Sequence, residues 1–340
     1  MGRRWSPTAE KAEEDMNELR SLGSSGIEVS AIGLGTSTFG WTASPGEAGR
    51  ILDFYVDAGG NHIDTSPTYP QWVQGHSGGE AESIIGDWLV RNGRRDEVVL
   101  ATKVGKGREA RGLSATAIRL GIDASLRRLR TDRVDVFSLH LWDSRVPIDE
   151  TLEAVDELVR AGKVRAVGVS NFTADQLAQS LVAALAGRWA APAVAQSAYS
   201  LVERSGLDDR LRRMVAREAT GFVAHSALAK GFLSGKYTRD APVGVEVDRM
   251  IDVAGYCTPQ GFAVLDIVQG IAAATGSTPA AVSIAWVLST PEVSSLLVSA
   301  RSAAQLREIL NAGDLTLGTA ELRALDAAGS SVAVGQHRSS

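Results

Sequence analysis

The sequence predicts a single (β/α)8 barrel, the TIM-barrel fold of the α/β class, from three observations. Eight short apolar runs alternate with amphipathic segments, which is typical of parallel strands that are buried on both faces and separated by helices. The 340-residue chain has no internal linker. Eight β/α units without a linker favour a closed barrel over an open sheet. The predicted strands are 32–38, 61–66, 98–104, 135–141, 164–170, 193–199, 221–227 and 294–300.

The helices between these strands carry start and stop signals. Residues 44–47 read Ser-Pro-Gly-Glu, a capping box with proline at the first helical position. Thr173 with Gln176, and Thr278 followed by Pro279, predict two further helix starts. The glycines expected to end helices in the left-handed conformation are Gly59, Gly93, Gly162, Gly187 and Gly276.

Three segments fall outside the eight-fold repeat. Residues 19–32 place two glycines between alternating apolar positions and predict a β-hairpin before the barrel. Residues 230–258, after the seventh strand, form a loop too long for a plain βα connection, and long loops are usually functional or mobile. A last helix is expected at 319–328. The expected organisation is a disordered leader (1–16), one barrel domain (17–329) and a loose tail (330–340).

Composition narrows the class of protein. Thirty-five Lys and Arg stand against 40 Asp and Glu, so a formal net charge of -5 gives no reason to expect a nucleic-acid partner. The single cysteine, Cys257, cannot form an internal disulfide, which fits a reducing cytoplasm. We leave open whether the chain forms a homo-oligomer.

The N-terminus resembles two targeting signals without completing either. Arg3 and Arg4 are followed by the charged stretch 8–15 and not by the apolar run of an export signal. Gly2 and Ser6 fit the loose myristoylation pattern, but no polybasic segment follows them. No stretch approaches the ~20 apolar residues of a membrane span. We therefore expect a cytoplasmic protein with no membrane partner.

Ionisable and polar residues stand at the ends of successive predicted strands, whose interiors are otherwise apolar. The second strand ends in Asp64 with Tyr69 just beyond it, the third in Lys103 and the fourth in His140. The C-terminal strand ends of a barrel meet at the face where active sites are built. A lone histidine is more often a satisfied core residue, but four ionisable groups that converge by topology predict a site. Further polar residues at strand ends are Ser170, Asn171, Gln196 and His225.

These residue types suit the reduction of a carbonyl. A tyrosine has an ordinary pKa of ~10, and a neighbouring lysine lowers that pKa by stabilising the phenolate. A carboxylate holds the lysine charged, and a neutral imidazole offers a hydrogen-bond donor to a carbonyl oxygen. Together they form a proton donor aimed at a carbonyl. No side chain supplies hydride, so a nicotinamide cofactor is implied.

Seven ordered stretches resemble the aldo-keto reductase superfamily over about 19–328. They are NHIDTSPTY, VLATKVG, FSLHLWD, VRAVGVSNF, AVAQSAYSL, AHSALAKGFLSGKY and LLVSARSAAQL. Residues 72–89 place the chain nearest the branch of bacterial reductases and potassium-channel β-subunit-like proteins. The resemblance implies a catalytic tetrad of Asp64, Tyr69, Lys103 and His140.

The same resemblance implies a cofactor site without a Rossmann fingerprint. Asn171 and Gln196 would bind the nicotinamide carboxamide, and His225 would stack on its ring. The other residues that it assigns to the cofactor are Gly35, Thr36, Asp64, Ser170, Ser226, Ala227, Leu228, Lys236, Arg301, Gln305 and Glu308. Four positions depart from the family pattern. His225 replaces a larger aromatic residue, Ala227 a proline, Ser299 a glycine and Ile309 an asparagine.

We expect NADPH in preference to NADH because Arg301 and Lys236 would bind its phosphates, and we expect no metal ion. Trp41, Trp72 and Trp142 follow strand ends and predict an aromatic pocket for an apolar or ring-bearing carbonyl. Three alternatives stay open. They are a redox-sensing, NADP-binding subunit with slow turnover, a Schiff base on Lys103 as in barrel aldolases, and a nucleotide-sugar ketoreductase.

Overall fold

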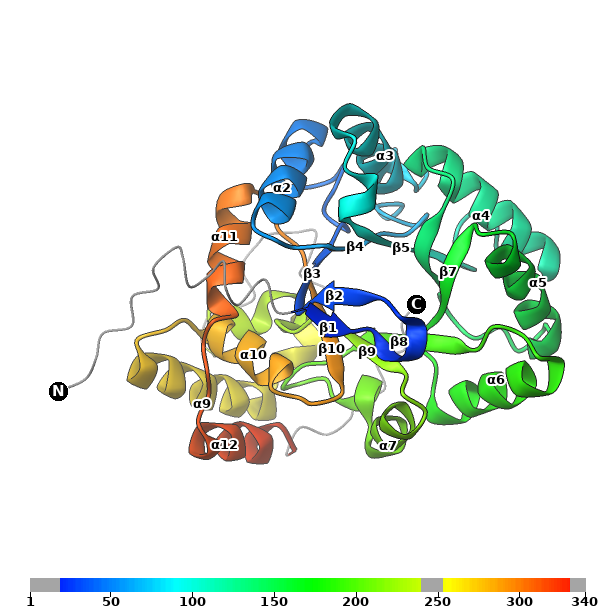
Figure 1. Cartoon of the computed structure of the whole chain (residues 1–340). Coiled ribbons are helices and arrows are strands. Elements are labelled where there is room, and N and C mark those ends of the chain that lie inside the picture. Colours follow the sequence, from blue (N-terminus) through cyan, green and yellow to red (C-terminus); the bar gives the residue numbers. More distant parts are fainter. Residues whose placement is uncertain (1–18, 240–252, 331–340) are drawn as a thin grey trace.

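Eight parallel strands close into a barrel in the computed structural model, which describes residues 19–239 and 253–330 (Figure 1). Each strand pairs with the next along the chain. The last strand closes the barrel against the first, with 296–298 paired to 32–34. The strands are β3 Ile32–Gly35, β4 His62–Asp64, β5 Val99–Val104, β6 Val134–Leu139, β7 Val164–Ser170, β8 Pro192–Ala198, β9 Gly221–His225 and β10 Val293–Val298. The predicted (β/α)8 fold is confirmed.

The predicted leader, most of the tail and residues 240–252 of the long loop lie outside the described residues. β3, β4, β6, β8, β9 and β10 end one to three residues earlier than the sequence predicts. At the end of β3 the backbone N–H of Thr36 and its hydroxyl each donate to the Asp64 carbonyl at 3.0 Å. These bonds join the ends of β3 and β4.

Helices surround the barrel on all sides (Figure 1). They are α2 Pro45–Asp57, α3 Glu80–Asn92, α4 Ala115–Leu129, α5 Ile148–Arg160, α6 Ala174–Gly187, α7 Asp209–Arg217, α9 Pro259–Thr275, α10 Pro279–Leu288, α11 Ala303–Ala312 and α12 Thr319–Ser330. The last of these includes Ser330, which the sequence assigns to the tail. In the described part of the chain no single helix is long and apolar enough to cross a membrane. Only α9 and α10 together reach that length and composition, and they are bent by 100°.

The predicted helix starts are present, with one correction. Thr173 and Gln176 form a reciprocal capping box on α6, and Thr278 caps α10. At α2 only half of the predicted box forms. The Glu47 backbone N–H donates to Ser44 Oγ, but the Glu47 carboxylate accepts the N–H of Ala303, at the start of α11, at 3.0 Å. Glu47 therefore joins two helices and does not complete its own cap.

Four of the five glycines predicted at helix ends have positive φ, and Gly187 does not. At the end of α6 the left-handed residue is Arg188, with φ of 57°. Gly187 is the last residue of the helix, and a Cβ there would lie 2.3 Å from the Trp189 ring. Close packing against this ring is what calls for glycine at 187.

The predicted hairpin is present and closes the N-terminal end of the barrel. β1 Leu19–Ser21 pairs antiparallel with β2 Glu28–Ser30. Leu22, Ile27 and Val29 are buried in a cluster with the inward residues of the barrel strands. Gly23, with φ of 59°, has room for no side chain, because a Cβ would lie 2.2 Å from the backbone nitrogen of Gly221.

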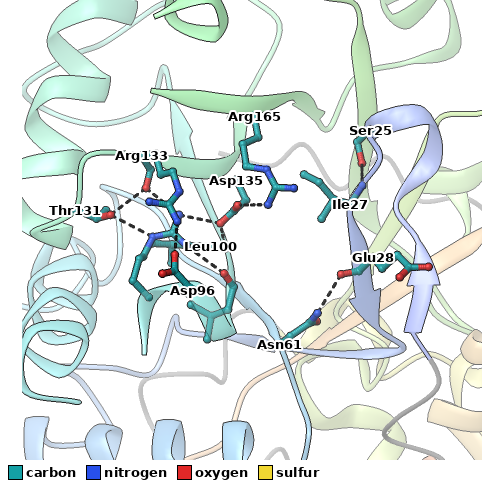
Figure 2. A network of polar contacts seen from close by, with 12 residues as sticks. Ser25, Ile27, Glu28, Asn61, Asp96, Leu100, Thr131, Arg133, Asp135 and Arg165 are labelled. Atoms are coloured by element: carbon teal, nitrogen blue, oxygen red, sulfur yellow. Dashed lines mark hydrogen bonds and ion pairs between the residues drawn. The ribbon is translucent and has the colours of Figure 1, made fainter. Parts of the chain in front are cut away.

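A buried carboxylate holds the strands together at the same end. Asp135, at the start of β6, is 2% exposed and pairs with Arg95 at 2.9 Å and Arg165 at 2.7 Å. It also accepts the backbone N–H of Leu100 at 2.9 Å. Figure 2 shows Asp135 and Arg165 near the hairpin residue Ile27. The N-terminal end is thus closed by apolar packing and a satisfied ion pair, as expected for the stability face of a barrel.

Replacement of a hairpin core residue is expected to destabilise the fold. Leu22→Ala removes a side chain with no exposed surface and should lower the free energy of unfolding by about 2–5 kcal/mol. Urea unfolding measures this. Leu185→Ala, at a position 82% exposed, is the control and should change it by less than about 0.5 kcal/mol. Equal stabilities for the two variants would contradict a closing role for the hairpin.

Candidate active site

One large cavity of about 1620 Å³ opens at the C-terminal ends of the strands. It brings together most of the residues that the sequence predicts for the site. Those that line it are Gly35, Trp41, Asp64, Tyr69, Trp72, Lys103, His140, Ser170, Asn171, Gln196, His225, Ser226, Ala227, Leu228, Lys236, Arg301, Gln305 and Glu308. Its volume exceeds the ~300–1,000 Å³ of a usual small-molecule pocket, so it has room for two ligands.

A buried ion pair lies at the inner end of the cavity. Lys103 Nζ, on β5, donates to both carboxylate oxygens of Asp64, at 2.8 and 2.6 Å, and to the Thr65 carbonyl at 3.0 Å. The two side chains are 2% and 4% exposed. Burial alone would lower the pKa of Lys103, but the charge of Asp64, together with Tyr69, raises that pKa above its ordinary value. Lys103 is therefore charged near neutral pH.

Tyr69 stands beside this pair, in the connection between β4 and α3. Lys103 Nζ lies 5.3 Å from the centre of its ring. The Tyr69 carbonyl accepts the N–H groups of Gly79, at 3.1 Å, and Ala81, at 3.4 Å, at the start of α3. Burial raises the pKa of the phenol above 10, while the Lys103 charge opposes that rise and the Asp64 charge adds to it. The sequence argument predicts a net lowering. The net direction is upward because burial is the largest contribution.

Two neutral histidines complete the inner end of the cavity. Burial, with the charges of Lys103 and Lys106, lowers the pKa of His140 to about 2. His140 Nδ1 is buried and has no hydrogen-bond partner in the described part of the chain. Burial and Lys103 lower the pKa of His225 to about 4, and its Nδ1 lies 2.9 Å from Ser226 Oγ. Both imidazoles are uncharged near neutral pH.

Two amide side chains lie at the ends of β7 and β8. Gln196 Nε2 donates to Asp64 Oδ1 at 2.9 Å, so this glutamine helps to satisfy the buried carboxylate. Asn171 takes a left-handed conformation, with φ of 58°. Its Nδ2 donates to Ser170 Oγ at 3.0 Å and to the His140 carbonyl at 3.2 Å. A left-handed asparagine at a strand end turns its amide toward the cavity that it lines.

The outer part of the cavity offers groups that suit phosphates. After β9, Ser226, Ala229, Lys230 and Gly231 all have positive φ, and alternation of right- and left-handed residues forms the backbone concavities that bind anions. Across the cavity lies the start of α11. There Gln305 accepts the backbone N–H of Arg301 at 2.8 Å, and the Gln305 N–H donates to Ser302 Oγ at 3.2 Å.

Two predicted residues do not line the cavity. Thr36 has no exposed surface, and its hydroxyl donates to the Asp64 carbonyl. Trp142 packs edge-on against Phe172 with 5.4 Å between ring centres, and Phe172 lines the cavity in its place. Trp41 and Trp72 do line it and pack edge-on, 5.9 Å apart.

Sequence reasoning missed other lining residues. They include Ser37, Thr38, Phe172, Glu203, Asp208, Lys230, Tyr256, Ser277, Thr278 and Asn311. Phe172 follows Asn171 directly and could have been found from that neighbour. Asn311 lies two residues after Ile309, and both residues line the cavity. In the described ranges no three His, Cys, Asp or Glu residues group as a metal site.

Comparisons with known proteins agree with this geometry. Residues 31–330 match the model of the aldo/keto reductase family. The chain is 35% identical to the uncharacterized oxidoreductase YrpG of Bacillus subtilis, over 91% of this chain and 95% of that protein. It is 32% identical to the protein tas of Escherichia coli (89% and 95%) and 31% identical to a probable voltage-gated potassium channel subunit beta of Arabidopsis thaliana (88% and 92%). The chain belongs to the aldo/keto reductase family of oxidoreductases, which act on small carbonyl compounds.

Proposed function

We propose that the protein reduces an aldehyde or ketone to an alcohol with NADPH, and that Tyr69 donates the proton. The observation that carries this proposal is the buried Asp64–Lys103 pair beside a buried phenol at the inner end of a large cavity. A charged lysine fixed next to a tyrosine has one evident chemical use, which is to stabilise the phenolate that remains after proton transfer.

The residues present fit a nicotinamide dinucleotide. Asn171 lines the inner end with an amide suited to a carboxamide, while Arg301, Lys230 and Lys236 line the outer part with cations suited to phosphates. The left-handed residues after β9 would cradle the diphosphate. When bound, the cofactor supplies the hydride that no side chain can give.

The proton transfer follows from the charge states of the residues. Tyr69 holds its proton until reaction, because burial raises the pKa of the phenol. With the cofactor bound, Tyr69 would give its proton to the substrate's carbonyl oxygen as that oxygen gains negative charge. Lys103 then faces the phenolate, and Asp64 keeps the lysine in place. Neutral His140 orients the carbonyl oxygen without competing as an acid.

The alternatives are less well supported. A Schiff base requires a neutral lysine, whereas the Asp64 carboxylate keeps Lys103 protonated. Two further alternatives are a redox-sensing subunit with slow turnover and a nucleotide-sugar ketoreductase. Steady-state assays on a panel of aldehydes and ketones with NADPH separate the redox-sensing role from rapid turnover, and nucleotide-linked sugars in the panel test the ketoreductase alternative.

Tyr69→Phe is expected to remove turnover and spare cofactor binding. The phenol acts only in the reaction, so kcat should fall by the ~10²–10⁴-fold of a general acid, while the Kd for NADPH stays unchanged. Tyr199→Phe is the matched control, because it removes a second buried hydroxyl, bonded to Arg212 outside the cavity. More than about a tenth of the wild-type rate in Tyr69→Phe would take the proton-donor role from this residue.

The His140 ring is expected to stay neutral between pH 5 and 9. Its ring resonances in NMR spectra should not titrate, whereas those of the urea-unfolded chain should titrate near ~6.5. A midpoint between pH 6 and 7 in the folded protein would contradict the neutral donor. The pKa of the folded state lies below that of the unfolded state, so this contribution to stability is present above pH 6.5 and is lost as the pH falls toward 2.

Arg301→Ala is expected to weaken NADPH binding and leave NADH binding nearly unchanged. The two cofactors differ only in a phosphate on the adenosine ribose, and a charge-assisted bond of roughly 1.5–3 kcal/mol corresponds to about a ten- to hundredfold change in Kd. Arg307→Ala is the control, because Arg307 lies on α11, which begins just after Arg301, and its guanidinium stacks on Phe54. Equal losses for both cofactors would show that Arg301 does not recognise the phosphate.

A further inference from the structure

We propose that Glu82 and Arg128, which lie outside the cavity, are positioning residues for Tyr69. In this inference one buried carboxylate joins the strand that carries Lys103 to the helix start that holds the tyrosine, and so fixes the phenol relative to the ammonium group. It rests on the proposed role of Tyr69 as proton donor.

Glu82 is a fully buried carboxylate in the first turn of α3. Each of its oxygens has a partner. Thr102 Oγ1 donates to Oε1 at 2.6 Å, and Arg128 Nε donates to Oε2 at 2.7 Å. Thr102 directly precedes Lys103 on β5. The carboxylate therefore ties the start of α3 to the backbone from which Lys103 extends.

Arg128, near the end of α4, holds the start of α3 from the other side. Its Nη1 pairs with Glu109 of the β5–α4 connection at 2.7 Å. Its side chain lies against Gly79, where a Cβ would be 2.6 Å from the guanidinium Nε, and its carbonyl lies against Gly86, where a Cβ would be 2.2 Å away. Both glycines flank the first turns of α3, so the arginine fixes this helix start from outside.

The helix start in turn holds the tyrosine. The Tyr69 carbonyl accepts the N–H groups of Gly79 and Ala81. Arg128 packs against Gly79, and Glu82 follows Ala81 in the chain. The Glu82–Arg128 ion pair is thus connected to both groups of the site. It is connected to Lys103 through Thr102, and to Tyr69 through the start of α3. A displacement of about 1 Å in a reacting group can reduce the rate about a hundredfold.

The expected signature is a change in the titration of the phenol. The charged groups whose interactions with Tyr69 shift its pKa are Lys103, which lowers it, and Asp64, which raises it, while the nearby imidazoles of His140 and His225 are neutral. The charged groups that face Arg128 are the carboxylates of Glu82 and Glu109. If α3 shifts and Tyr69 moves away from Lys103, the phenolate loses stabilisation and its pKa rises further. A variant that only weakened the fold would not move this pKa.

The barrel provides a matched control at its opposite end. Asp135 is also a buried carboxylate, and the partners of its side chain are Arg95, Arg165 and the Leu100 N–H (Figure 2). Asp135→Asn and Glu82→Gln both replace a buried, arginine-paired carboxylate by its amide. Any effect common to the two variants reports on stability, and any effect of Glu82→Gln alone reports on the site.

The experiment measures kcat for reduction, the pH dependence of alcohol oxidation and the Kd for NADPH in the full chain. We expect Glu82→Gln to lower kcat by about tenfold or more and to move the alkaline midpoint of oxidation upward by about one pH unit, with Kd within about twofold of wild type. Arg128→Lys, which keeps the charge but cannot contact both carboxylates, should change both quantities in the same direction by less. It serves as the test if Glu82→Gln does not fold.

Asp135→Asn should leave the midpoint unchanged. A wild-type midpoint in whichever of the two positioning variants folds, or an equal shift in Asp135→Asn, would overturn the inference. Tyr69→Phe, assayed in parallel, separates this outcome from failure of the proposed function. Full activity in Tyr69→Phe refutes the role of Tyr69 as proton donor, whereas loss of activity there with a wild-type midpoint in Glu82→Gln refutes only the positioning role.

Discussion

The ion pair between Lys103 and Asp64 is the interaction on which the rest of the site depends. Removal of two charges from water costs several kcal/mol per ion unless their remaining donors and acceptors are satisfied. Here the Thr65 carbonyl and the Gln196 amide complete the partners of the pair. The pair then sets its surroundings, because the lysine charge opposes the rise in the pKa of Tyr69 and helps to keep His140 and His225 neutral.

The N-terminal end of the barrel contributes to the stability of the fold, and the C-terminal end carries the candidate active site. At the N-terminal end, the hairpin residues Leu22, Ile27 and Val29 fill the barrel, and Asp135 is fully paired. At the C-terminal end, the last residues of the strands line the cavity. Asp135 is as buried as Asp64, but its partners Arg95 and Arg165 are more exposed than Lys103. Tyr69 lies beside the Lys103–Asp64 pair. Substitutions at the closed end therefore test the fold without touching the chemistry.

Much of this could be predicted from the sequence, because strand ends are positions in a repeat. Asp64, Lys103 and His140 fall where apolar runs stop, and topology alone brings them together. Trp142 and Thr36 could not be placed in this way, because the direction of a side chain beyond a strand depends on the loop that follows. The Glu82–Arg128 pair joins residues 46 positions apart in sequence, on helices whose mutual approach depends on glycines. No local pattern in the sequence predicts such a contact.

The net direction of the pKa shift at Tyr69 also bears on the direction of the reaction. A general acid must be protonated when the carbonyl arrives, and a phenol with a raised pKa meets that requirement throughout the neutral range. The reverse reaction needs the phenolate, which becomes common only at alkaline pH. Without Lys103 the pKa would rise further and the proton would leave less readily. The lysine thus limits how far burial raises this pKa, so the phenol both holds its proton before the reaction and releases it in the transition state.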